Sequence, residues 1–142
     1  MMNEQVRKIM TKNPTTISPS QSIQELTEIM YNEKVQQLPV VDNGQFVGLI
    51  TTHDLWAFPA NQEDLKSKKV KEVMNEHVIK ISPKDKVGTA AELFMDKRFK
   101  TLPVVNLKNE LKGVVTSFDV LRHALRQEYN NHILYKEVIE QK

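Results

Sequence analysis

Hydrophobic positions along the chain follow two different periods, and each period predicts a different kind of element. Between residues 23 and 30 the apolar side chains recur every three or four positions, which is the spacing of one helix face. Ser22 and Glu25 stand at the start of this stretch with the spacing of a capping box, so we expect a helix to begin there. Residues 87–94 carry a similar apolar pattern and predict a second helix.

Short β-rich runs predict two hairpins. The runs at residues 38–41 and 46–50 enclose Asn43 and Gly44, and an Asn-Gly pair between apolar runs is a strong hairpin signal. A second hairpin is expected farther along the chain, with a loop at residues 106–110 that is one residue longer.

Shorter elements are expected in matching pairs. They are helical lead-ins at residues 6–10 and 70–74, short strands at residues 15–17 and 78–81, and closing helices from about Thr52 and Ser117. A Ser-Pro pair ends each of the short strands. Each element expected in the first half of the chain therefore has a counterpart in the second half.

These counterparts are repeated in sequence as well as in pattern. The run Leu-Pro-Val-Val begins at Leu38 and again at Leu102, at an offset of 64 residues. The pattern Gly-x-x-Thr-x-x-Asp occupies residues 48–54 and returns at residues 113–119, at an offset of 65. Because one copy is too small to bury both faces of its sheet, we expect two mixed α/β repeats that pack with pseudo-twofold symmetry.

The repeat divides the chain into three parts. Residues 1–60 are expected to hold the first repeat and the start of a connector, residues 61–126 the second repeat, and residues 127–142 a helical tail. Residues 60–69 are polar and rich in lysine, which predicts a solvated connector. The tail has a thin apolar stripe, which suits either a solvated extension of the last helix or a contact with a second copy or a partner.

Composition narrows the classes of function. The absence of cysteine excludes a disulfide framework, a thiolate zinc site and a cysteine nucleophile. The 20 Lys and Arg against 18 Asp and Glu give a net charge of +2, too weak to argue for nucleic acid or an anionic membrane. No apolar run approaches the roughly 20 residues that cross a bilayer, and the N-terminus lacks the apolar region of a signal peptide. We therefore expect a soluble cytoplasmic protein.

The repeated Gly-x-x-Thr-x-x-Asp pattern is the strongest chemical signal. It places a strand end against a helix start, where the hydroxyl of Thr51 or Thr116 and free backbone N–H groups can receive a phosphate oxygen. Asp54 and Asp119 each offer two acceptor oxygens, which suit the vicinal hydroxyls of ribose. The same Thr-x-x-Asp spacing is that of a helix-capping box, in which the aspartate only satisfies a backbone N–H, and both interpretations stay open.

Taken together, the repeated residues resemble the CBS domain, named from cystathionine beta-synthase. The signature positions are Met10 and residues 17–19, 38–42 and 48–54, with Met74 and residues 81–83, 102–106 and 113–119 as their second set. The resemblance runs from about Val6 to Arg122 as a tandem CBS pair, or Bateman module. It implies an α/β (α+β) fold of two β-α-β-β-α repeats, assembled as a homodimer.

The resemblance also implies two clefts for an adenosine-containing ligand such as AMP, ADP, ATP, S-adenosylmethionine or a cyclic dinucleotide. The residues carried over to the first cleft are Thr15, Thr16, Leu38, Pro39, Thr51, His53 and Asp54. Those carried over to the second cleft are Val78, Ile79, Lys80, Leu102, Pro103, Thr116, Phe118 and Asp119. In each cleft the aspartate is expected to accept from ribose and the threonine to face phosphate.

The two copies differ in charge. The second copy places Lys80, Arg98 and Lys100 near its expected cleft, and Arg98 and Lys100 are candidate phosphate contacts. Fixed cations favour a polyphosphate, because charge-assisted hydrogen bonds to phosphate are the stronger kind. The second cleft is therefore expected to prefer a phosphate-bearing ligand, although ordinary solvated surface charge explains the same residues.

The leading hypothesis is a regulatory sensor module without catalytic activity, because no nucleophile–base pair can be assembled from these residues and no cofactor is required. An adenine nucleotide would be its regulatory ligand, and an effector protein on another chain would receive the signal. The alternative is a ligand-free module for protein interaction or dimerisation. Nucleic-acid binding through the Lys-rich connector and the basic last helix is a minor alternative, and neither a membrane nor a metal site is expected.

Overall fold

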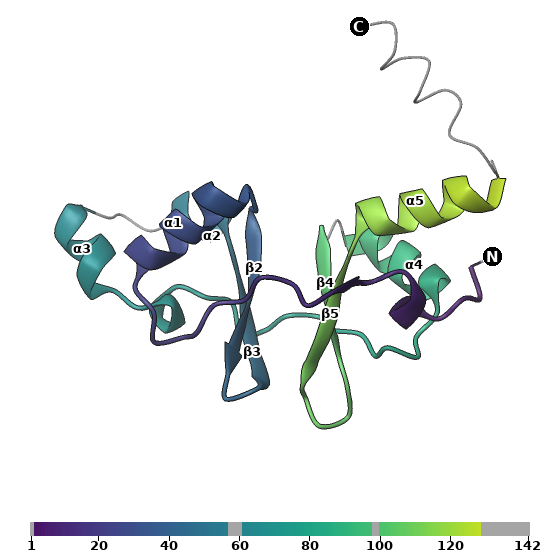
Figure 1. Ribbon diagram of the computed structural model, residues 1–142, viewed down its shortest axis with the longest axis horizontal. Coiled ribbons are helices and arrows are strands. Elements are labelled where there is room, and N and C mark those ends of the chain that lie inside the picture. Colours follow the sequence, from purple (N-terminus) through teal and green to yellow (C-terminus); the bar gives the residue numbers. More distant parts are fainter. Residues whose placement is uncertain (1, 57–60, 98–99, 129–142) are drawn as a thin grey trace, which may run out of the picture.

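Two β-hairpins stand side by side at the centre of the computed structural model, which describes residues 2–56, 61–97 and 100–128 (Figure 1). The first joins β2 (Gln37–Asp42) to β3 (Gln45–Thr51), and the second joins β4 (Thr101–Val105) to β5 (Leu111–Thr116). Asn43 and Gly44 have positive φ angles of 49° and 80°, the backbone geometry that matches the twist of a hairpin. Both expected hairpins are confirmed.

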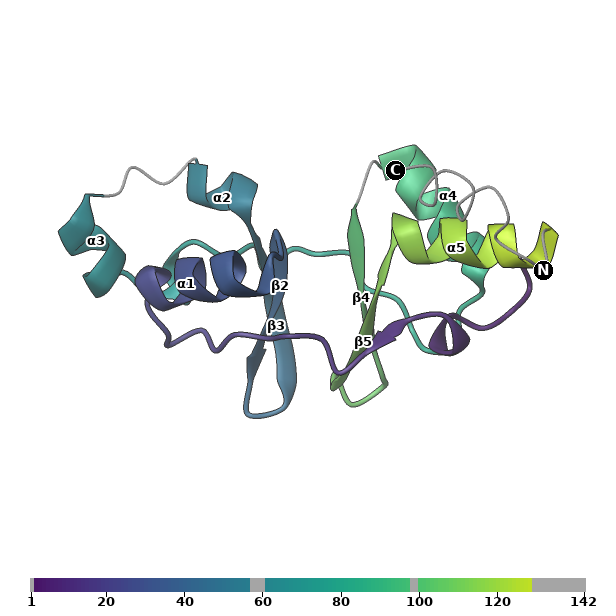
Figure 2. The same ribbon diagram turned by 45° about the horizontal axis from the view of Figure 1, so that its top comes forward.

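Helices flank the outer side of each hairpin (Figure 2). The first repeat contributes α1 (Ile23–Glu33) and α2 (Thr52–Trp56), and the second contributes α4 (Val87–Lys97) and α5 (Ser117–Glu128). The Ser22 hydroxyl accepts a hydrogen bond from the Glu25 backbone N–H at 3.1 Å. α1 therefore begins where its capping pattern predicts, because this bond satisfies one of the free N–H groups of the first turn.

The lead-in segment of each repeat crosses to the other repeat. The 3-10 helix η1 (Val6–Lys8) and strand β1 (Thr11–Lys12) belong to the first half of the sequence, yet β1 pairs antiparallel with β5. In the second half, η2 (Val70–Glu72) is followed by Asn75, which forms an antiparallel bridge with Leu49 of β3. Figure 1 shows the N-terminal segment passing from the side of α4 and α5 across both hairpins toward α1.

Each hydrophobic core takes one buried valine from the lead-in of the opposite repeat. The core beside the first hairpin contains Ile17, Ile23, Leu26, Met30, Leu38, Val40, Ile50 and Val70. The core beside the second hairpin contains Val6, Ile81, Val87, Ala90, Phe94, Leu102, Val104, Val115 and Val120. Val6 and Val70 are each fully buried in the core of the opposite repeat. Neither core therefore follows the division of the sequence into halves.

Gly48 allows the lead-in of the second repeat to pass close to the backbone of β3. A β-carbon at Gly48 would lie 2.8 Å from the backbone carbonyl oxygen of Asn75 and 3.2 Å from the sulfur of Met74. Such distances leave no room for a side chain, so the first signature glycine is required where the opposite lead-in passes over the hairpin.

Two expected strands are reduced to single bridges. Residues 15–17 and 78–81 do not form strands, and only Ile17 and Ile81 make bridges, each parallel to the central hairpin strand of its own repeat. Ile17 exchanges backbone hydrogen bonds with β2, since its N–H donates to Pro39 at 3.1 Å and its carbonyl accepts from Val41 at 2.9 Å. The pairing ends after this one residue, where Ser-Pro follows.

The expected solvated connector contains a short helix, which the lysine-rich composition did not predict. α3 (Gln62–Ser67) begins at Asn61, whose side chain accepts from the Asp64 N–H at 2.9 Å while the Asp64 carboxylate accepts from the Asn61 N–H at 3.4 Å. The reciprocal bonds form a capping box, and its Asn-x-x-Asp spacing was visible in the sequence. α5 ends at Glu128, and the remainder of the expected tail lies outside the described residues.

Candidate functional site

Two pockets lie between the repeats, and each combines segments from both halves of the chain. The smaller, which we call the Thr116 pocket, has a volume of about 550 Å³; it is lined by Thr11, Asn13, Pro14, Thr15, Lys34, Val35, Gln36, Gln37, Leu38, Pro39, Lys100, Thr101, Val114 and Thr116. The larger, the Asp54 pocket, has a volume of about 980 Å³; it is lined by Gln36, Gln37, Leu49, Thr51, Thr52, His53, Asp54, Asn75, His77, Val78, Lys100 and Thr101. Both volumes fall in the range of small-molecule sites.

The two pockets are related by the internal repeat. Thr11, Asn13 and Pro14 line the Thr116 pocket, and their counterparts 64 positions later, Asn75, His77 and Val78, line the Asp54 pocket. Gln36 and its counterpart Lys100 line both pockets. Their carbonyl oxygens accept from the first residues of α2 and α5, at 2.9 Å from Thr52 and 3.4 Å from Ser117. The two side chains therefore start from equivalent positions where the pockets meet.

The crossing of the lead-ins changes the expected grouping of residues. Thr15, Leu38 and Pro39 were assigned to one cleft with Thr51 and Asp54, but they line the Thr116 pocket instead. Val78 was assigned to the cleft of the second signature, but it lines the Asp54 pocket. For Thr15 and Val78 the physical reason is that the lead-in of one repeat lies against the hairpin of the other, so each pocket pairs a lead-in with the opposite Thr-x-x-Asp corner. Leu38 and Pro39 lie on β2 and line the Thr116 pocket from the first hairpin.

The first Thr-x-x-Asp corner is a capping arrangement that also faces a pocket. The Asp54 Oδ2 accepts from the Thr51 backbone N–H at 2.9 Å and from the Thr51 hydroxyl at 3.0 Å. The Thr51 Oγ1 in turn accepts from the Asp54 N–H at 3.2 Å. The carboxylate is partly exposed, and within the described residues its other oxygen, Oδ1, has no hydrogen-bond donor. Asp54 therefore caps α2 with one oxygen and presents the other for further contacts.

The second corner has the same cap but a different environment. The Asp119 Oδ2 accepts from the Thr116 N–H at 2.9 Å, and the Thr116 Oγ1 accepts from the Asp119 N–H at 3.1 Å. Asp119 is only 5% exposed, and its Oδ1 lies 3.5 Å from the Arg122 guanidinium. It does not line the Thr116 pocket, whereas Thr116 does. The cap interpretation thus fits Asp119 well, because its two oxygens already face donors.

The other expected residues of the second cleft do not line these two pockets. Leu102 and Pro103 are fully buried, Ile79 is 39% exposed on the surface, and Phe118 is 65% exposed with the Arg122 guanidinium 5.3 Å from its ring centre. Lys80 donates to the Asn109 side-chain oxygen at 2.9 Å and lies 5.9 Å from the ring centre of Phe46, near the hairpin ends. Lys80 is therefore not among the residues that line either inter-repeat pocket.

Lys100 lines both pockets, so it is not specific to the second signature, and its role as a phosphate contact stays a prediction. Arg98, the other expected phosphate contact, lies outside the described residues. Thr16 is exposed and does not line either pocket, whereas His53 does line the Asp54 pocket. Among the described residues that were expected at a cleft, Lys100 and His53 line a pocket and remain candidates for a phosphate contact.

Sequence reasoning missed several lining residues, above all Asn13 and His77. Both precede the segment that was expected to hold adenine, and they occupy equivalent positions in the two repeats. The repeat offset could have identified them as a pair. What it could not reveal is that each lead-in crosses to the opposite hairpin.

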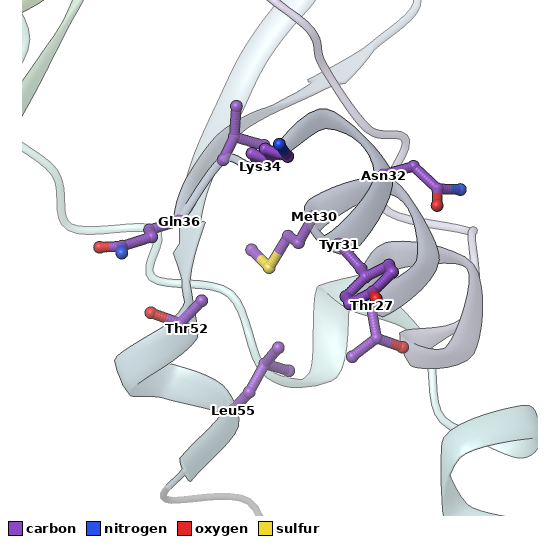
Figure 3. Close-up of a pocket in the computed structure, with 9 residues that line it drawn as sticks. Thr27, Met30, Tyr31, Asn32, Lys34, Gln36, Thr52 and Leu55 are labelled. Atoms are coloured by element: carbon purple, nitrogen blue, oxygen red, sulfur yellow. The ribbon is translucent and has the colours of Figure 1, made fainter. Parts of the chain in front are cut away.

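A third pocket lies within the first repeat, between α1 and α2 (Figure 3). It has a volume of about 710 Å³ and includes Met30 and Leu55, whose side chains approach one another from the two helices. No group of three His, Asp or Glu side chains that could hold a metal ion occurs in the described ranges. Within the same ranges, no helix combines the length and the apolar character needed to span a membrane.

The CBS domain family model matches residues 6–55 and 70–126. The chain therefore belongs to the CBS domain family, and its two matched segments form a tandem pair. This result confirms the resemblance of the repeated signatures, and the α+β fold class is confirmed by the structural neighbours.

Two solved structures of CBS-pair proteins illustrate the likeness. The structure of CBSX2 in complex with AMP has a TM-score of 0.80 and 28% identity, and it covers 88% of this chain and 98% of that chain; CBSX2 is a protein of Arabidopsis thaliana. The CBS domain pair of MJ0100, in complex with 5′-methylthioadenosine and S-adenosyl-L-methionine, has a TM-score of 0.72 and 31% identity. It covers 84% of this chain and 94% of that chain.

Curated relatives include longer proteins. Protein MJ1225 of Methanocaldococcus jannaschii is 28% identical over 132 residues, which are 85% of this chain and 47% of MJ1225. Inosine-5′-monophosphate dehydrogenase of the same organism is 35% identical over 116 residues, 81% of this chain but 22% of the enzyme. The CBS domain-containing protein YhcV of Bacillus subtilis is 29% identical over 123 residues, which are 87% of this chain and 87% of YhcV. The chain thus spans less than half the length of the first two relatives.

Proposed function

We propose that the chain is a regulatory module that binds an adenosine-containing ligand between its two CBS repeats and catalyses no reaction. The observation that carries the proposal is the Asp54 pocket, in which a partly exposed carboxylate faces a cavity of about 980 Å³ lined by both repeats. Support comes from the similar CBS pairs of CBSX2 and MJ0100, which are complexed with AMP and with S-adenosylmethionine and 5′-methylthioadenosine.

The ribose is assigned to the free oxygen of Asp54. Oδ2 is already engaged by Thr51, so Oδ1 is the atom that accepts from one or both ribose hydroxyls. The Thr116 pocket is a second, separate site.

In that pocket Thr15, Leu38 and Pro39 form the wall that we assign to the base of a second ligand. The Thr116 hydroxyl donates no hydrogen bond within the described residues, so its proton is available to that ligand.

Regulation follows from the shared walls of the two pockets. A ligand that contacts the lead-in of one repeat and the hairpin of the other stabilises the arrangement in which both contacts are made. The change in packing would be read by a separate effector protein or by a second copy of the chain. The effector protein and the second copy are both part of the proposal.

A thermal-shift screen tests ligand binding. AMP, ADP, ATP, S-adenosylmethionine, 5′-methylthioadenosine and adenosine are compared with GMP and CMP as controls. A ligand at 100 times its Kd adds about 2.7 kcal/mol to the free energy of unfolding, which raises the Tm visibly. Stabilisation by adenine compounds alone supports the proposal, and a flat screen at millimolar ligand refutes it.

An interaction module without ligand is the second candidate, and specific exposed side chains favour it. Tyr31 is 84% exposed, Trp56 83% and Met95 81%, and all three lie on helices that flank the hairpins. Tyr31 and Met95 occupy equivalent positions of the two repeats. Exposed large apolar side chains on flanking helices suit a contact with a second copy or a partner. A dimer in sedimentation that is insensitive to every adenine compound would favour this function instead.

A further inference from the structure

The two hairpins are hydrogen-bonded to each other where their strands turn. The Phe46 backbone N–H donates to the carbonyl oxygen of Asn109 at 2.9 Å, and the Asn109 side-chain Nδ2 donates to the carbonyl oxygen of Phe46 at 2.8 Å. Their chain neighbours Gln45 and Glu110 form an antiparallel bridge. We call the reciprocal pair of bonds between Asn109 and Phe46 the hairpin latch.

Asn109 lies in the loop in which the two repeats differ in length. The loop at residues 106–110 is one residue longer than its counterpart, so the repeat offset changes from 64 to 65. Asn109 has a φ of 61°, a left-handed conformation that asparagine tolerates better than most residues. The Asn106 Oδ1 accepts from the backbone N–H groups of Lys108 at 3.0 Å and Glu110 at 2.9 Å. These bonds fix the longer loop, which presents the Asn109 amide to the other hairpin.

The partners of the Asn109 amide determine its orientation. The Lys80 ammonium donates to Oδ1 at 2.9 Å, and an ammonium group can only donate. Nδ2 then faces the Phe46 carbonyl oxygen, which can only accept. Lys80 is exposed, so its bond orients the amide more than it stabilises the contact. The Phe46 side chain is 5% exposed, so the first hairpin receives the latch at a residue that is packed in place.

The latch lies at the opposite end of the hairpins from the two inter-repeat pockets. Gln37 pairs with Thr51 and Thr101 with Thr116 at the open ends of the hairpins, and all four line a pocket. Figure 1 shows both turns on the side away from α2 and α5. From its pocket end to its turn, β2 extends about 17 Å at about 3.3 Å per residue. Neither residue of the latch lines the Asp54 pocket or the Thr116 pocket.

This separation makes the latch a pivot with a long arm. Each pocket takes walls from both hairpins, so the angle between the hairpins sets the distance between those walls. A change of about 5° at the latch displaces the pocket ends of the strands by about 1.5 Å over this arm. Such a displacement is large enough to break a hydrogen bond to a ligand that bridges the two walls.

We propose that Asn109 is a positioning residue for both inter-repeat pockets, because the latch fixes the angle between the hairpins and holds the pocket walls at the separation that a ligand needs. Asn109 lies outside the pockets and acts through the hairpins. The inference rests on the proposed function, since it explains what sets the affinity of the proposed sites. By linkage, a ligand that binds the latched arrangement better also stabilises the latch.

Two variants break the latch and one serves as the matched control. Asn109→Gly removes the side-chain bond and keeps the left-handed backbone, because glycine adopts positive φ readily. Asn109→Asp keeps the size of the side chain but loses the donor to Phe46, so it answers the question if the glycine variant fails to fold. Asn43→Gly is the control, since it makes the same change at an exposed residue with a φ of 49° in the other hairpin turn.

Calorimetry with the full chain measures the affinity for AMP. Asn109→Gly and Asn109→Asp are each expected to weaken binding about fivefold, which corresponds to one hydrogen bond of about 1 kcal/mol. Asn43→Gly is expected to change the affinity by less than about twofold, because its side chain is exposed at a turn that does not carry the latch amide.

A distance measurement reports the angle without requiring a ligand. Because the chain contains no cysteine, nitroxide labels can be attached through Glu28→Cys and Glu92→Cys, which are exposed and equivalent positions of α1 and α4. The labelled chain is diluted into an excess of unlabelled chain, so that electron–electron resonance reports distances within one chain. Asn109→Gly is expected to broaden the distance distribution of the free chain, and AMP is expected to narrow it again. A role of Asn109 in stability alone would leave the distribution of the folded chain unchanged.

Equal AMP affinity of the wild type and both Asn109 variants would overturn the inference and leave the proposed function intact. An equal loss after Asn43→Gly would also overturn it, because any change at a hairpin turn would then lower the affinity. So would a loss of affinity without broadening, because the effect would not act through the angle. If no adenine compound binds the wild-type chain, the proposed function fails, and the distance distribution alone decides whether the latch fixes the angle.

Discussion

A β-carbon at Gly113 would lie 2.6 Å from the backbone carbonyl oxygen of Thr11, a residue of the other repeat. The two segments are neighbouring strands, since Thr11 of β1 is paired with Val114 of β5. The signature glycine is therefore needed for the crossing of the lead-in, and the same holds for Gly48 beside Asn75. The glycine of the Gly-x-x-Thr-x-x-Asp pattern thus accommodates protein backbone in both repeats.

Gly113→Ala is expected to destabilise the fold strongly. The added methyl group meets a backbone oxygen that belongs to a paired strand, so the strand must shift or the pairing must break. Overpacking of this kind typically costs about 1–3 kcal/mol of unfolding free energy. Urea unfolding followed by circular dichroism measures the loss.

The matched control is Gly44→Ala in the first hairpin turn. Its β-carbon would meet nothing within 4 Å, but its φ of 80° is a conformation that alanine rarely adopts. The expected loss is about 1 kcal/mol, from backbone strain alone. A loss at Gly113 no larger than this would show that β1 is not closely packed on β5.

Val6→Ala is expected to destabilise the core of the second repeat, although Val6 lies in the first half of the sequence. Val6 is fully buried beside Ile81 and Val87, so truncation removes buried methyl groups and leaves a cavity. About 2 kcal/mol of unfolding free energy should be lost. Val70→Ala, the equivalent change in the other core, should cost a similar amount.

Hydrogen exchange locates the effect. After Val6→Ala, amides of α4 and β4 should exchange faster, whereas those of α1 and β2 should change less. The opposite pattern would mean that the lead-in packs on its own repeat, as the order of the sequence suggests.

The hairpins, the main helices and the tandem repeat could be predicted because local signals determine them. Asn43-Gly44 defines a turn whatever surrounds it, and Ser22 with Glu25 defines a helix start in the same way. The paired signatures could be aligned by eye because a duplicated unit repeats its requirements for small, apolar and capping residues at the same positions.

The grouping of site residues could not be predicted, because it depends on which hairpin each lead-in contacts. Thr15 and Thr51 belong to the same repeat, yet they line different pockets. Nothing in a single sequence distinguishes a lead-in that folds back on its own hairpin from one that crosses to the other. Lys80 differs for another reason: it lies beside Ile81, which bridges β4 of its own repeat, and its ammonium reaches Asn109 in the loop of the second hairpin.

The two signature aspartates should respond differently to removal. Asp54→Ala is expected to weaken binding of AMP by about 10- to 100-fold, the range for one or two hydrogen bonds to a charged group. Its cost in stability should be about 1 kcal/mol, the usual value of a helix cap. Calorimetry and urea unfolding on the same preparation separate the two effects.

Asp119→Ala is the internal comparison. Asp119 is buried, accepts from the Thr116 N–H and faces Arg122, so its removal leaves a donor unsatisfied and should cost about 2 kcal/mol of stability. Affinity for AMP in the folded fraction should change less than after Asp54→Ala. A larger loss of affinity at Asp119 would contradict the assignment of the ribose to Asp54.

Lys100 and Lys80 were both expected near the second cleft, but only Lys100 lines a pocket between the repeats, so the two lysines provide a further test. Lys100 lines both inter-repeat pockets, whereas Lys80 lies between Asn109 and the ring of Phe46. Lys100→Gln, which copies the counterpart Gln36, is expected to lower the affinity for AMP about tenfold, because it removes a charge-assisted contact to the phosphate. Calorimetry with adenosine should show no change.

Lys80→Gln is the matched control, since it removes the same charge from the same repeat. Affinity for AMP should stay within about twofold of the wild-type value, because the lysine ammonium is held by an amide oxygen and an aromatic face away from the pockets. If both variants weaken AMP binding equally and high salt abolishes the difference from wild type, the effect is long-range attraction by surface charge. A loss confined to Lys100→Gln, retained in salt, requires a direct contact, because a close pair in a partly enclosed pocket is screened far less than an exposed one.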